Sequence, residues 1–160
     1  MIKETSGEKP RIRRGESVAS ALDVAAYILR RRGPMSGKKL QKLVYYSQAW
    51  SLAWTGEPLF ADRIEAWRDG PVVPGLFAEH RYANEVTDIT GGNAEALTPR
   101  QMDTVDSVLG FYADRTAEDL IKMSHDEEPW RDARRGLLSW HAGNSEISHE
   151  SMRKYYSSLH

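Results

Sequence analysis

One stretch of the chain, residues 36–56, constrains the fold more than any other part of the sequence. Ser36 is a residue type that commonly caps the start of a helix, and Gly56 is one that commonly ends it. The apolar and aromatic positions between them are Leu40, Leu43, Val44, Tyr45, Tyr46, Ala49, Trp50, Leu52, Ala53 and Trp54. They cover most of the circumference of a helix, and such a helix usually lies at the centre of a domain. The stretch therefore predicts a mainly α-helical fold in which other helices surround this one.

The rest of the chain predicts further helices and one small β element. Helical spacing of apolar residues, or a capping residue before them, predicts helices over residues 17–32, 71–84, 98–112, 116–125, 130–138 and 148–156. Alternating side chains favour short strands at 63–68 and 85–89, which could pair with each other. Residues 1–15 carry five Lys or Arg and few large aliphatic residues, so we expect a flexible basic tail there. We expect one compact helical domain over residues 16–160, with a small β-hairpin or two-stranded element.

The overall composition excludes several classes of protein. Lys and Arg number 22 against 23 Asp and Glu, a balance that disfavours a dedicated nucleic-acid binder. The chain has no cysteine, so disulfides, cysteine nucleophiles and zinc sites built from cysteine are excluded. The first ten residues lack the apolar core of a secretory signal, and the most apolar stretch, residues 43–54, is shorter than the roughly 20 residues of a membrane span. These features predict a cytoplasmic protein with no membrane contact.

No motif for catalysis or for a cofactor stands out. The five histidines are scattered without the spacing of metal ligands, and neither a phosphate-binding loop nor a nucleophile elbow occurs. His125 is followed by three carboxylates, Asp126, Glu127 and Glu128, which could form a metal site or an acid–base pair. Consecutive residues point in different directions, however, so they rarely converge on one ion. We therefore expect a non-enzymatic protein without metal or cofactor, and we keep a metal-dependent enzyme that uses His125 as an alternative.

Four segments of the chain, in order, resemble the Panacea antitoxin domain, a family that includes GepA-like phage-associated proteins and SocA-like antitoxins. They are residues 39–50 (KLQKLVYYSQAW), 56–60 (GEPLF), 64–72 (IEAWRDGPV) and 124–130 (SHDEEPW). Each segment is weakly specific by itself, whereas the four in this order are specific. The resemblance covers residues 18–138. It implies a small, mainly helical bacterial or phage protein that neutralises a protein toxin encoded beside it.

The resemblance implies an antitoxin that acts by protein–protein interaction, and it leaves two mechanisms open. The protein could cover the cognate toxin, or it could be a proteolytic adaptor that delivers the toxin to an ATP-dependent protease such as ClpXP. The candidate partner-binding or motif residues are Tyr45, Tyr46, Gln48, Trp50, Trp67, Gly70, Pro71, His125 and Trp130. We favour a core role for Tyr46, Gln48 and Trp67, whose polar atoms need hydrogen bonds if they are buried. Gly70 and Pro71 fit a turn that leads into a helix, and Trp130 fits either the core or an interface.

Overall fold

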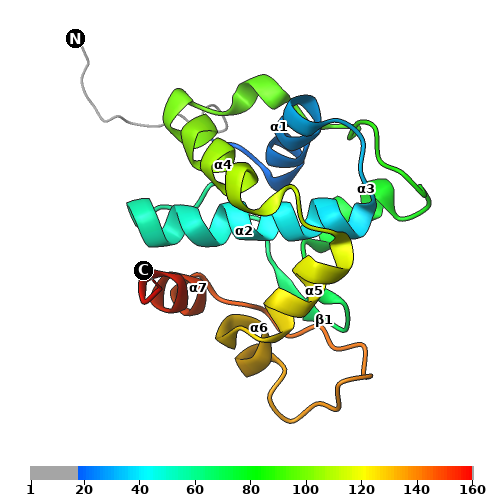
Figure 1. The fold of residues 1–160 in the computed structure, drawn as a ribbon, viewed down its shortest axis with the longest axis vertical. Coiled ribbons are helices and arrows are strands. Elements are labelled where there is room, and N and C mark those ends of the chain that lie inside the picture. Colours follow the sequence, from blue (N-terminus) through cyan, green and yellow to red (C-terminus); the bar gives the residue numbers. More distant parts are fainter. Residues whose placement is uncertain (1–17, 160) are drawn as a thin grey trace.

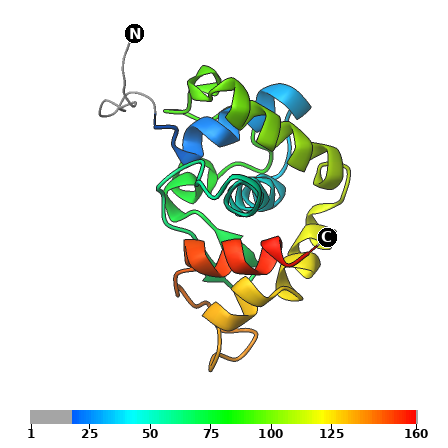
Figure 2. The ribbon, with the colours of Figure 1, turned by 90° about the vertical axis from the view of Figure 1, so that its left-hand side faces the viewer.

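The computed structural model describes residues 18–159, and its helices are arranged around one central helix (Figure 1). That helix, α2 (Gly37–Thr55), is seen nearly end-on in Figure 2, with α1 (Ala21–Arg32) and α4 (Pro99–Tyr112) on one side of it. On the other side lie α5 (Ala117–His125), α6 (Glu128–Ala133) and α7 (His149–Ser157). The remaining elements are β1 (Glu65–Trp67), β2 (Gly70–Val72), α3 (Pro74–His80) and a short 3-10 helix, η1 (Ala94–Ala96). The basic tail predicted at residues 1–15 lies outside the described residues.

The central position predicted for residues 36–56 is confirmed, and so is the mainly α-helical fold. The Ser36 hydroxyl accepts the Lys39 backbone N–H at 3.2 Å, and Gly56 ends the helix in the left-handed conformation (φ 79°). Side chains on all sides of α2 are fully buried, namely Leu40, Leu43, Val44, Tyr46, Ser47, Gln48 and Ala49. Neither α2 nor any other helix between residues 18 and 159 is long and apolar enough to cross a membrane.

Capping side chains begin three other helices where the sequence predicts them. Thr98 Oγ1 accepts the Gln101 backbone N–H at 3.1 Å, and Gln101 Oε1 accepts the Thr98 N–H at 2.9 Å, which closes a capping box at the start of α4. The hydroxyls of Thr116 and Ser148 cap α5 and α7 by accepting the backbone N–H groups of Asp119 and Ser151. Each cap satisfies a backbone N–H that the first turn of a helix leaves without a partner.

The β element differs from the prediction that residues 63–68 pair with residues 85–89. β1 pairs instead with β2 in an antiparallel hairpin, with Glu65 opposite Val72 and Trp67 opposite Gly70. Gly70 adopts a positive φ of 110°, which lets the chain reverse direction over the two residues between the strands. β1 therefore pairs with the segment that directly follows it and not with residues 85–89. Val86 forms only an isolated bridge with Met35, which fastens the loop after α3 to the start of α2.

The bounds of three helices also correct the prediction. The helix expected over 17–32 is α1, which begins at Ala21 because the Ser20 side chain caps its first turn. The helix expected over 71–84 is α3, which begins at Pro74. Pro71 lies in β2, and the Gln41 side-chain amide binds both the N–H and the carbonyl of Val73, so these residues are held outside the helix. The helix expected over 130–138 is α6, which begins at Glu128 and ends at Ala133. Beyond it, the Arg134 guanidinium donates to the carbonyls of the following loop, so those carbonyls are bonded without a continuing helix.

Candidate protein-interaction surface

Tyr45 and Tyr46 of α2 lie inside the protein, in a cluster of tyrosines around one carboxylate. Tyr46 and Tyr156 both donate their hydroxyls to Glu127 Oε1, at 2.8 and 2.7 Å, and the hydroxyls of Tyr45 and Tyr156 are 3.0 Å apart. Tyr45 and Tyr46 are at most 1% exposed, and burial raises the pKa of each phenol well above its usual value. Because Glu127 precedes α6 and Tyr156 belongs to α7, the cluster ties both helices to α2. We refer to it as the tyrosine–Glu127 cluster.

Gln48 and Trp50, the other two candidate residues of α2, differ in how deeply they are buried. Gln48 is fully buried and holds the chain after α2, because its amide donates to the Phe60 carbonyl at 2.8 Å and accepts the Leu59 N–H at 2.7 Å. Trp50 is only half-buried, and its indole N–H donates to the Tyr112 hydroxyl at 2.9 Å. Gln48 therefore has a packing role, whereas one part of Trp50 remains at the surface.

The other five candidate residues belong to the β-hairpin (Trp67, Gly70 and Pro71) or to α5 and α6 beside it (His125 and Trp130), and we call them the hairpin cluster. The Trp130 indole N–H donates to the Trp67 carbonyl at 2.8 Å, and the His125 ring stacks on Trp130 with centroids 3.9 Å apart. Gly70 and Pro71 are buried in β2, while the Trp67 ring is half-buried with its edge against Phe77. These contacts join the hairpin to α5 and α6.

Lys42, a buried ion beside the hairpin cluster, was not singled out from the sequence. It is 1% exposed and lies so close to Gly70 that a Cβ there would overlap its Cε. Burial lowers the pKa of the Lys42 ammonium group to about 7, against the opposing effect of Asp69. Burial also lowers the pKa of His125, whose Nε2 has no hydrogen-bond partner in the described part of the chain. Among residues 18–159, no three His, Asp or Glu side chains are grouped so that they could hold a metal ion.

An apolar groove lies on the face where α2, α4, α5 and the end of α7 meet. Three large apolar side chains are exposed at it, Trp54 by 52%, Phe111 by 60% and Leu159 by 38%. The cavity has a volume of about 700 Å³ and is lined by Trp50, Trp54, Ser107, Val108, Phe111, Tyr112, Met123, Glu127 and Leu159. Exposed aromatic residues gathered at one hollow are typical of a protein-binding surface.

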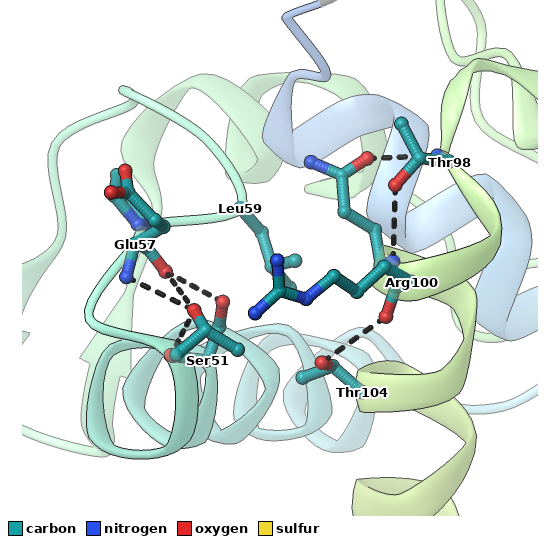
Figure 3. Close-up of a pocket in the computed structure, with 9 residues that line it drawn as sticks. Ser51, Glu57, Leu59, Thr98, Arg100 and Thr104 are labelled. Atoms are coloured by element: carbon teal, nitrogen blue, oxygen red, sulfur yellow. Dashed lines mark hydrogen bonds between the residues drawn. The ribbon is translucent and has the colours of Figure 1, made fainter.

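A smaller pocket near the end of α2 has a different character (Figure 3). It measures about 180 Å³ and is lined mainly by polar side chains, with Arg100 extending toward Ser51 and Glu57. Its hydroxyls are already bonded, since Ser51 donates to the Glu57 carbonyl at 2.6 Å and Thr104 donates to the Arg100 carbonyl. These hydroxyls are therefore not free to bind a ligand, and we do not regard the pocket as the functional site.

Sequence reasoning did not identify the apolar groove. The buried residues of α4 are Thr104, Val105, Val108, Leu109 and Tyr112, and Phe111 lies off that stripe. A large aromatic residue away from the buried stripe of a helix is the signal that could have found it. Trp54 belongs to the apolar residues of the central helix, yet it is 52% exposed. Leu159 gave no signal, because it follows the last helix.

Comparison with known proteins identifies one family. The sequence model described as "Antitoxin SocA-like, Panacea domain" matches residues 40–131. This range begins in α2, ends in α6 and includes the hairpin cluster and every residue of the apolar groove except Leu159. No curated protein and no solved structure is found to match the chain.

Proposed function

The chain belongs to the SocA-like antitoxin family with a Panacea domain, and from this membership we propose that it is the antitoxin of a toxin–antitoxin pair. It binds a cognate protein toxin and neutralises it by covering a surface that the toxin needs. The role is non-enzymatic and is exercised in the cytoplasm. The buried tyrosines of the tyrosine–Glu127 cluster serve the fold, which is consistent with a binding function.

The apolar groove is the observation that supports this proposal from the structure. Interfaces that hold two proteins together bury about 1,600 Å² in total and depend on a few aromatic or Arg anchors. Trp54 and Phe111 are exposed by half or more, and they flank a cavity large enough to take side chains of a partner. The groove is therefore the surface that we assign to the toxin.

Co-expression with the protein encoded by the neighbouring gene tests the proposed function. That protein alone should arrest growth, and growth should resume when both proteins are expressed. Purification through a tag on one chain should then recover both in a fixed ratio. Persistent growth arrest together with no complex would contradict an antitoxin role for this pair.

A second surface supports the proteolytic adaptor as an additional function. Leu138 and Trp140, in the loop after α6, are exposed by 59% and 65%. The Arg134 guanidinium holds this loop by donating to the carbonyls of Ala66, Leu138 and Ala142, at 3.0, 3.2 and 2.9 Å. An adaptor must contact a toxin and a protease at the same time, and no residue of this loop lines the apolar groove.

The adaptor function predicts a change in the lifetime of the toxin. In cells that contain the protease, the toxin should disappear faster when this protein is present. Replacing Leu138 and Trp140 by Ser should slow that turnover while the toxin still co-purifies. Equal toxin lifetimes with and without the protease would leave covering as the whole mechanism.

A further inference from the structure

Glu127 places one carboxylate oxygen in the tyrosine–Glu127 cluster and leaves the other free. Oε1 accepts both tyrosine hydroxyls, at 2.8 and 2.7 Å. Oε2 accepts no hydrogen bond from any residue between 18 and 159, and it is not among the polar atoms sealed from solvent. Glu127 lines the apolar groove, so a partner bound there meets this side chain.

The chain around Glu127 carries an excess of negative charge. Between residues 113 and 131, six Asp or Glu stand against three Lys or Arg. Of these charges, that of Asp126 acts on Glu127 directly, because together with burial it raises the pKa of the Glu127 carboxyl. The field at this end of the groove therefore favours a cation.

A partner that covers the groove must also satisfy Glu127. Docking removes water from the free oxygen, and a desolvated carboxylate oxygen without a donor costs free energy. An apolar segment alone would leave that cost unmet, whereas a Lys or Arg would offset it through a charge-assisted hydrogen bond. The same geometry discriminates against partners that lack the cation.

We propose that the apolar groove binds a segment of the cognate toxin in which a Lys or Arg stands between apolar side chains and pairs with Glu127 Oε2. The identity of the partner rests on the proposed function. Trp54, Phe111 and Leu159 contact the apolar side chains, and Glu127 selects the basic one.

Binding of the purified protein to the product of the neighbouring gene, measured by calorimetry, tests this proposal. Glu127→Gln keeps an oxygen for Tyr46 and Tyr156 but replaces the free oxygen by an amide, so the fold should persist. It should weaken binding by about 30-fold or more, the usual consequence of removing one member of a buried charge pair. Phe111→Ser and Trp54→Ser should each weaken binding by about tenfold or more. The matched control is Tyr82→Ser, because Tyr82 is 88% exposed and does not line the groove.

Each outcome decides a different part of the proposal. A wild-type complex that tolerates Phe111→Ser and Trp54→Ser would overturn the groove as the docking site while the antitoxin function stands. Weaker binding by those two variants with full affinity for Glu127→Gln would overturn the charge pairing. A wild-type dimer that Phe111→Ser separates would show that a second copy of this chain occupies the groove, which also overturns the proposal. If the wild-type protein forms no complex, the proposed function fails first.

Discussion

Replacing Lys42 by Met should stabilise the protein and change how its stability depends on pH. Lys42 is 1% exposed, and burial is the main reason that the pKa of its ammonium group falls from 10.5 to about 7. In the unfolded chain the same group is solvated and has its ordinary pKa. The folded protein therefore binds the Lys42 proton less tightly than the unfolded chain does.

The size and the sign of the effect follow from these two pKa values. Between pH 7 and pH 10.5 the unfolded chain holds more protons, so the contribution of Lys42 makes the free energy of unfolding rise with pH. At about 1.4 kcal/mol per pKa unit, the whole difference corresponds to about 5 kcal/mol. The destabilisation is complete below the folded pKa and disappears above the unfolded one. It amounts to about 4 kcal/mol at pH 7 and about 2 kcal/mol at pH 9.

Urea unfolding of the wild-type protein and of Lys42→Met at pH 7, 8 and 9 measures this contribution. The advantage of the variant should shrink by about 2 kcal/mol from pH 7 to pH 9. A change in packing caused by Met adds a constant and does not alter that trend. Lys122→Met is the matched control, because Lys122 is exposed on α5 and its replacement should leave the pH profile parallel to that of the wild type. A constant difference between Lys42→Met and wild type at all three pH values would refute the reasoning.

Two further predictions concern the hairpin and the loop after α6. Gly70→Ala should lower the free energy of unfolding by at least about 2 kcal/mol, because Gly70 has a φ of 110° and a Cβ there would overlap Lys42. The control is Gly110→Ala on an open face of α4, which should instead raise the free energy of unfolding by about 0.5–1 kcal/mol. Equal effects in urea unfolding would contradict the close approach at Gly70. Arg134→Met should speed chymotrypsin cleavage at Leu138 and Trp140 by about tenfold or more, since the loop carbonyls lose a charged donor. An unchanged cleavage rate would show that Arg134 does not hold the loop.

Local signals in the sequence were sufficient for most of the helical framework. Ser36, Thr98, Thr116 and Ser148 begin their helices as predicted, because a cap bonds to backbone groups within three residues of itself. The central helix was predictable for a similar reason, since a helix that is apolar around its circumference must be covered on all sides. The four family-like segments likewise indicated the antitoxin family from their residues and their order along the chain.

Other features depend on which segments meet in space. The burial of Lys42 follows from the approach of Gly70 and Ser124, which are far from it in the sequence, and nothing in the pattern around Lys42 distinguishes it from an exposed lysine. Glu127 has two neighbouring carboxylates, yet the hydroxyls of Tyr46 and Tyr156 single it out. The apolar groove combines Trp54, Phe111 and Leu159 from three separate parts of the chain. The exposure of these side chains and the environment of Glu127 are properties of the assembled surface. The tertiary structure was therefore needed to find the groove that we assign to a partner.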